Sequence, residues 1–191
     1  MKNTRDLILA NTFVLLLKNG RDNVSISDIQ NKTGISRGLV YKYFSGKSEL
    51  VFEACKKFFF EEFYAGMEDM TLGGCVDFLS KNLGRVMRTL SKIAGEKIDV
   101  LKYNLLYAEM LMRDERLNAC ARKWSAFLGR KVLRRAKASG EIKDVPDSFV
   151  RNVFLDIAGR VSYLGGGGAN FDCCGSIVRD MKMLYELLKC E

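Results

Sequence analysis

The sequence predicts an all-helical protein. Its 191 residues are 48% hydrophobic and include a single proline, and valine, isoleucine and threonine rarely alternate with polar residues. Apolar residues instead recur at three- and four-residue intervals, the period of an amphipathic helix. This length is enough for one domain with a good core, or for a small module joined to a larger one.

Two helices are expected at the N-terminus. The first covers residues 4–18, where apolar side chains fall at helical spacing, and Asn19-Gly20 is a typical helix end. A short second helix should cover residues 26–33. Ser25 and Asp28 before and within it have the spacing of a capping box, in which each side chain pairs with a free backbone N–H of the first turn.

A third helix of two turns is expected over residues 37–43. Gly34 suits the end of the preceding helix and Ser36 can cap the next one. Because two turns are not stable alone, Val40 and Phe44 must anchor this helix in a core. The pattern is therefore helix, tight turn, helix.

The rest of the chain predicts longer helices over residues 47–65, 72–94, 97–113, 115–139, 147–164 and 175–189. The last two flank the segment GGGGANFDCCG and have apolar stripes that favour docking on a second copy as a four-helix bundle. The alternative is that both helices pack on their own domain. The predicted dimerisation residues are Val153, Ile157, Val161, Leu164, Ile177, Met181, Leu184 and Leu188.

The net charge of +8 favours a polyanionic partner, with nucleic acid first and an anionic membrane surface second. Residues 34–44, GISRGLVYKYF, crowd cations and aromatic rings onto the third helix. In a helix-turn-helix this helix lies in the major groove, where Arg37 can bind guanine and Leu39 can contact a thymine methyl. Tyr41 fits packing as well as phosphate contact. The candidate DNA-binding residues are Ser25, Ser27, Ser36, Arg37, Gly38, Leu39, Tyr41, Lys42, Tyr43 and Lys47.

No enzymatic activity, metal or cofactor is expected. Gly34, Ser36 and Gly38 spell G-x-S-x-G, but the chain contains no histidine to activate the serine. Gly46-Lys47-Ser48 ends like a P-loop, yet Tyr41 stands where that motif needs its first glycine. The six cysteines have no C-x-x-C spacing and no histidine partner for zinc.

The sequence also predicts a cytoplasmic protein without a membrane partner. It opens on no leader-like segment and contains no apolar run of about 20 residues. The cysteines are then expected to be reduced. An alternative function uses Cys173, Cys174 or Cys120 as a redox switch that ends DNA binding.

Residues from about Leu7 to Leu50 resemble the DNA-binding domain of the TetR family of bacterial transcriptional regulators. The resemblance rests on NG after the first helix, on SISDI, and on TGISRGLVYKYFSGKSEL. Gln30, Thr33 and Leu39 depart from the residues common in the family. Leu39 cannot make the hydrogen bond of a threonine, so no known operator sequence can be transferred to this chain.

The resemblance implies a homodimer that binds a palindromic operator on double-stranded DNA and represses transcription until an unknown small molecule binds. It implies a helix-turn-helix domain over residues 1–46 and a larger helical ligand-binding and dimerisation domain over residues 47–191. Glu109 or Asp156 would favour a cationic ligand, whereas Arg88 or Lys102 would attract an anionic one. The aromatic and methionine residues predicted to line the pocket are Phe59, Phe63, Phe78, Met87, Tyr103, Tyr107, Met110, Trp124, Phe127 and Phe154.

Overall fold

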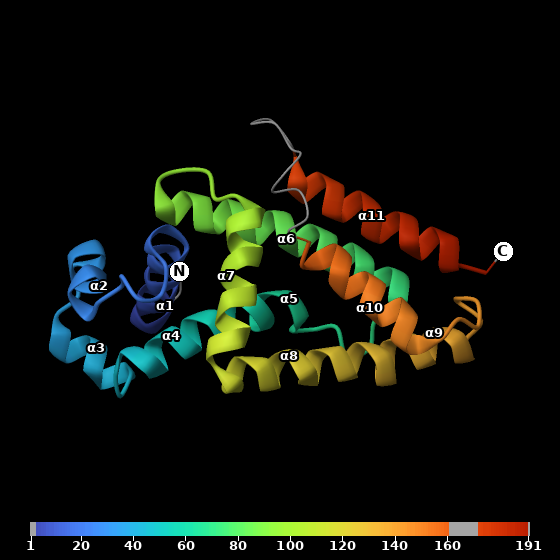
Figure 1. Cartoon of the computed structure of the whole chain (residues 1–191), viewed down its shortest axis with the longest axis horizontal. Coiled ribbons are helices and arrows are strands. Elements are labelled where there is room, and N and C mark those ends of the chain that lie inside the picture. Colours follow the sequence, from blue (N-terminus) through green and yellow to red (C-terminus); the bar gives the residue numbers. More distant parts are fainter. Residues whose placement is uncertain (1–2, 161–171, 191) are drawn as a thin grey trace.

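The computed structural model describes residues 3–160 and 172–190, which form helices joined by short turns (Figure 1). The predicted all-helical class is confirmed. No helix within these ranges is both long enough and apolar enough to cross a membrane. Val161, Leu164 and most of the glycine-rich segment, for which predictions were made above, lie outside the described residues.

The first three helices form the predicted helix-turn-helix arrangement. They are α1 (Thr4–Asn19), α2 (Ile26–Thr33) and α3 (Arg37–Tyr43). Ser25 and Asp28 make both hydrogen bonds of the capping box at the start of α2. Gly34 ends α2 with a φ of 71°, a left-handed conformation that glycine adopts without steric cost.

The predicted helix over residues 47–65 follows one path but contains a change of helical type. It consists of α4 (Lys47–Lys56), the π-helical segment η1 (Lys57–Glu61) and α5 (Glu62–Tyr64). A π-helix has wider turns than an α-helix and therefore changes which side chains face the core. Phe58, Phe59 and Phe60 are consecutive and all three are buried.

The remaining helices are close to their predicted ranges. Asp99 accepts a hydrogen bond from the backbone N–H of Leu101, and its helix therefore begins at Val100 rather than at residue 97. Asp172 likewise caps the last helix, which begins at Cys173. These elements are α6 (Leu72–Ala94), α7 (Val100–Arg113), α8 (Glu115–Phe127), the π-helical segment η2 (Leu128–Leu133), α9 (Arg134–Ala138), α10 (Asp147–Ala158) and α11 (Cys173–Leu188).

The molecule is elongated, with α1, α2 and α3 at one end and the last turn of α11 at the other (Figure 1). α11 packs on α6 and on α10, while α10 also contacts η2. α7 crosses between these helices and packs on α8 and α1. α4 contacts both α1 and α8, and it therefore connects the helix-turn-helix to the larger helical domain.

A cluster of aromatic rings forms the core at this connection. The ring of Phe13 on α1 stacks on Phe58, with centroids 4.8 Å apart, and meets Phe59 edge-on at 5.1 Å. Tyr103 on α7 packs edge-on against Phe59, and its hydroxyl donates a hydrogen bond to the carbonyl of Phe58. The cluster therefore joins α1, η1 and α7.

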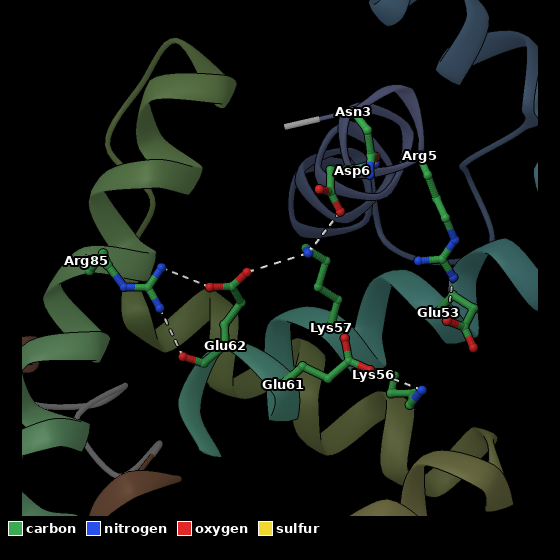
Figure 2. Close-up of polar contacts among 9 residues, drawn as sticks. All are labelled: Asn3, Arg5, Asp6, Glu53, Lys56, Lys57, Glu61, Glu62 and Arg85. Carbon is green, nitrogen blue, oxygen red and sulfur yellow. Dashed lines mark hydrogen bonds and ion pairs between the residues drawn. The ribbon is translucent and has the colours of Figure 1, made fainter. Parts of the chain in front are cut away.

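A chain of ion pairs also links α1, η1, α5 and α6 (Figure 2). Lys57 Nζ on η1 lies 3.0 Å from Asp6 Oδ1 on α1 and 3.7 Å from Glu62 Oε1 on α5. Glu62 continues the chain to α6, since its other carboxylate oxygen lies 2.9 Å from Arg85 Nη1. Among the described residues, the neighbouring Lys56 pairs only with Glu61, at 3.1 Å, and this pair is more exposed.

Lys57 and Lys56 therefore provide a matched test of these ion pairs. We expect Lys57→Met to lower the free energy of unfolding by about 1 kcal/mol, because it breaks two partly buried pairs between elements. Lys56→Met should cost less than about 0.5 kcal/mol, since its one pair is exposed. Urea unfolding of both variants measures the difference. Equal effects would contradict a special role for Lys57.

Candidate DNA-binding surface and ligand cavity

α3 presents one face to the core and the other to solvent. Val40 and Phe44 are 1% and 2% exposed, as expected for its anchors, and Ile29 of α2 is fully buried beside them. Tyr41 and Tyr43 are 42% and 39% exposed. Because a two-turn helix depends on its anchors, this burial fixes which side chains face outward.

Most of the predicted DNA-binding residues lie on the exposed side. Leu39 and Lys47 are half-buried, and the others are exposed. The exposed residues are Ser25, Ser27, Ser36, Arg37, Gly38, Tyr41, Lys42 and Tyr43.

Two serines cap the helices of this surface. Ser25 Oγ donates a hydrogen bond to Asp28 Oδ2 at 2.6 Å and accepts one from the backbone N–H of Asp28. The hydroxyl oxygen of Ser36 accepts a hydrogen bond from the backbone N–H of Leu39 at 3.3 Å. Ser36 therefore acts as a helix cap within this G-x-S-x-G sequence.

Arg37 and Tyr41 are paired along the exposed face of α3. Arg37 Nη2 lies 3.4 Å from the Tyr41 hydroxyl oxygen, to which it donates a hydrogen bond. The guanidinium carbon is 5.6 Å from the centre of the Tyr41 ring. Since the two residues are four positions apart on a helix, Tyr41 can hold the guanidinium on the side that faces away from the core.

The carboxylates of this region are each held by a neighbour. Hydrogen bonds from Ser25 lower the pKa of Asp28, and hydrogen bonds from Ser45 lower the pKa of Glu49. A hydrogen bond and the charge of Arg113 lower the pKa of Asp22. All three are therefore ionised at neutral pH.

The cations of the same surface are arranged differently. Within the described ranges, Arg37, Lys42 and Lys47 have no carboxylate within ion-pair distance. Their charges are available to phosphate groups, which bind lysine and arginine in protein–DNA complexes.

Nothing in the described part of the chain requires glycine at position 38. A Cβ atom built on it meets no atom within 4 Å, and its φ is not in the left-handed region. Glycine inside a helix costs about 1 kcal/mol relative to alanine. The absence of a side chain therefore leaves space on the outside of α3.

A cavity of about 730 Å³ lies among the helices of the larger domain. Four of the predicted ligand-contacting residues line it, namely Phe59, Phe63, Tyr103 and Tyr107. Burial raises the pKa of Tyr107, whose hydroxyl is therefore neutral at physiological pH. A space of this size, partly apolar with a few polar groups, is typical of small-molecule sites.

The other predicted pocket residues lie elsewhere. Trp124, Phe127 and Phe154 line a second, smaller cavity of about 50 Å³, which Tyr107 also borders. Phe78, Met87 and Met110 line neither of these two cavities. Met87 and Met110 are buried and Phe78 packs against the core, so these three stabilise the domain.

Sequence reasoning missed the polar wall of the larger cavity. Four small residues on α8 and η2 line the cavity and leave space for it. They are Ala121, Ser125, Ala126 and Gly129. These positions share one side of a helix, a spacing that was readable in the sequence. The arginines of the wall are Arg122, Arg130, Arg134 and Arg151.

The predicted dimerisation residues are mostly part of this chain's own core. Ile157, Ile177, Met181 and Leu188 are buried, and Ile177 and Met181 line the larger cavity. Val153 and Leu184 are half-buried and pack against the core. The large apolar residues that these two helices expose most are Phe149, Met183 and Leu187.

Comparisons with known proteins agree with this geometry. The sequence profile described as bacterial regulatory proteins of the tetR family matches residues 8–54, which contain α2, α3 and most of α1 and α4. No curated protein matches the chain.

Several solved structures share the fold over nearly the whole chain. A TetR-family transcriptional regulator from Agrobacterium tumefaciens is 23% identical with a TM-score of 0.65, and 97% of each chain is covered. The ketosteroid transcriptional regulator KstR2 of Mycobacterium tuberculosis is 14% identical with a TM-score of 0.64, covering 100% of this chain and 97% of that one. A TetR/AcrR-family regulator from Thermobifida fusca is 19% identical with a TM-score of 0.60, covering 95% and 96%. Residues 8–54 are therefore similar to the tetR family of bacterial regulatory proteins, and the chain as a whole shares the fold of these solved structures.

Proposed function

We propose that this chain is a ligand-responsive repressor of transcription that binds a palindromic operator as a homodimer. A small molecule in the 730 Å³ cavity would release it from DNA. The observation that carries the proposal is the exposed face of α3, where Arg37 and Lys42 have no carboxylate partner within the described residues. We propose a domain boundary between residues 46 and 47, where α4 begins.

The exposed face of α3 supports base contacts by some of its residues and phosphate contacts by others. Arg37 stands at the first position of the helix, from which it can bind guanine through paired hydrogen bonds. Lys42, Tyr43 and Lys47 follow towards the start of α4 and suit phosphate contacts. Leu39 is the adjacent apolar residue for a thymine methyl group.

Self-association of the chain would place two α3 helices on one operator. Met183 and Leu187 are 63% and 67% exposed and stand four residues apart on α11, so they form an apolar strip on one side of that helix. Phe149 on α10 is 59% exposed. We propose that these three residues, rather than the buried ones predicted from the sequence, contact the second copy.

The route from cavity to DNA runs along one continuous stretch of chain. Phe59, Phe63 and Tyr64 line the cavity and belong to η1 and α5, which continue α4. A ligand that displaces these side chains would move α4 and thereby the spacing of the two α3 helices. Operator half-sites lie about 34 Å apart, so the complex depends on that spacing. To shift the population of the conformation that does not bind DNA from 1:99 to 99:1, the ligand must bind it more tightly than the DNA-binding conformation by about 5.5 kcal/mol.

The thiol alternative has less support. Burial raises the pKa of Cys173 and of Cys174, which lowers the fraction of reactive thiolate at neutral pH. The pKa of Cys75 is raised to about 11 for the same reason. Cys190 is the exposed cysteine of the described residues.

Selection from a pool of random duplex DNA tests operator binding. We expect the protein to enrich a palindrome, and Arg37→Ala to lower affinity for it by about 1–3 kcal/mol and relax the preference at one base pair per half-site. Arg179→Ala is the control, since it removes an equal charge from an exposed position on α11. Enrichment of no sequence by a folded protein would refute the proposal.

Gly38→Ala separates helix stability from DNA contact. The substitution should raise the stability of α3 by up to about 1 kcal/mol, because alanine favours helix more than glycine does. It should weaken operator binding if the DNA backbone approaches this position closely. Thermal unfolding and fluorescence anisotropy on labelled operator measure the two effects. Unchanged affinity would show that DNA does not use this space.

Reaction with Ellman's reagent at pH 8 tests the thiol alternative. In the folded protein we expect Cys190 to react first, and Cys190→Ser to remove that fast phase. Cys173 and Cys174 should react slowly until the protein is unfolded. A fast phase that persists in Cys190→Ser and disappears in Cys174→Ser would favour the redox mechanism instead.

A further inference from the structure

The wall of the larger cavity carries more positive than negative charge. Four arginines line it, on α8, η2, α9 and α10, with Asp147 as the acidic residue among the lining side chains. Arg130 and Arg134 are four residues apart and follow the same side of the η2–α9 segment. Arg151 on α10 lies over Gly129, where its Nη1 is 3.5 Å from the site of a Cβ atom, so it faces η2.

The one lining carboxylate does not neutralise this wall. Asp147 lies 2.6 Å from Lys137, a cation outside the cavity lining, and 3.8 Å from Arg134. Arg122 pairs with the exposed Glu115. In the part of the chain that the structure describes, Arg130 and Arg151 have no carboxylate within ion-pair distance. These two guanidinium groups can therefore bind an anion.

The start of α10 adds to the positive potential. Its first turn borders the cavity through Asp147 and Ser148, and no side chain caps it because the preceding residue is Pro146. The first N–H groups of a helix carry a partial positive charge that favours anions. This partial charge lies beside the arginines. Their own charges favour an anion even without the helix start.

The opposite part of the cavity is apolar and aromatic. Phe59 and Phe63 are less than a tenth exposed, and Leu79, Leu83 and Met181 continue the surface from α6 and α11. A ligand that fills the cavity must therefore bury hydrocarbon at one end and place charge at the other. Neither carboxylate that could have favoured a cationic ligand lines the cavity, since Glu109 pairs with Arg113 and Asp156 lies outside it.

We propose that the cavity binds an amphipathic anion, a molecule with an apolar body and a carboxylate or phosphate head group held by Arg130 and Arg151. The proposal rests on the proposed function only in taking the cavity as the effector site. Guanidinium groups bind both head groups through paired charge-assisted hydrogen bonds, so their shared chemistry is an oxyanion.

The single tryptophan provides a direct measurement of binding. Trp124 stacks on Tyr64, with ring centroids 4.4 Å apart, and Tyr64 lines the cavity. Its fluorescence is therefore expected to change on titration with four probes of one chain length, below their micelle-forming concentrations. The probes are decanoate, decyl phosphate, decanol and decyltrimethylammonium.

At least one of the two anions should bind about tenfold or more tightly than decanol, and decyltrimethylammonium should bind most weakly. Arg130→Gln/Arg151→Gln should abolish the preference for the anion over decanol while decanol affinity stays unchanged. Lys123→Gln/Lys131→Gln is the matched control, because it removes two exposed cations of α8 and η2 that do not line the cavity, and it should retain the preference. Arg130→Gln alone should reduce the preference if the double variant does not fold.

Equal binding of decanol and both anions by the unmodified protein would overturn the inference, as would loss of the preference in the lysine variant. Adding the probes to the protein–operator complex separates this inference from the proposed function. Anion binding without DNA release supports the site and refutes the effector role. Release by decanol as readily as by decanoate supports the effector role and refutes the anion site.

Discussion

The contact of Phe13 with Phe58 and Phe59 is the interaction on which the arrangement of the molecule depends. It joins α1, which supports the helix-turn-helix, to η1, which continues α4. Phe59 also lines the larger cavity. One set of rings therefore belongs to the core of the N-terminal domain and to the floor of the cavity. Because close-packed interiors transmit small displacements, we expect a displacement of Phe59 by a ligand to shift α1.

Charge is distributed so that two cationic surfaces stay available. In the helix-turn-helix, Asp28 and Glu49 accept hydrogen bonds at helix starts and so do not neutralise Arg37. In the larger domain, Asp147 lies closer to Lys137 than to Arg134, so it does not fully neutralise the arginines of the cavity. Between the two surfaces, Lys57 and Glu62 connect α1 to α6 through ion pairs (Figure 2). The carboxylates thus make contacts within the structure, while Arg37 faces solvent and Arg130 and Arg151 line the cavity.

The features that the sequence predicted well depend on residues that are close together in the chain. The capping box at Ser25 and Asp28, the glycine after α2 and the anchors Val40 and Phe44 depend on residues close in the chain, so α1 to α3 were predictable within a residue or two. The exposed face of α3 followed from those anchors. The resemblance to a known family rested on the same short stretch.

The remaining features depend on contacts between distant segments. Helical periodicity assumes 3.6 residues per turn, so it could not indicate the π-helical turns that bury Phe58 to Phe60 together. The apolar stripes of α10 and α11 identified buried faces, but not whether they pack on this chain or on a second copy. The arginines of the cavity come from α8, η2, α9 and α10, and their convergence requires the tertiary structure.

The central claim is that the cavity communicates with the helix-turn-helix through η1, which continues α4 and packs on α1. Hydrogen–deuterium exchange with and without saturating decanoate tests it most directly, because exchange reports local opening segment by segment. We predict slower exchange in η1 and α5, which line the cavity, together with a change in α1, whose Phe13 packs on η1. Protection confined to α8, η2 and α10, with α1 unchanged, would contradict the claim.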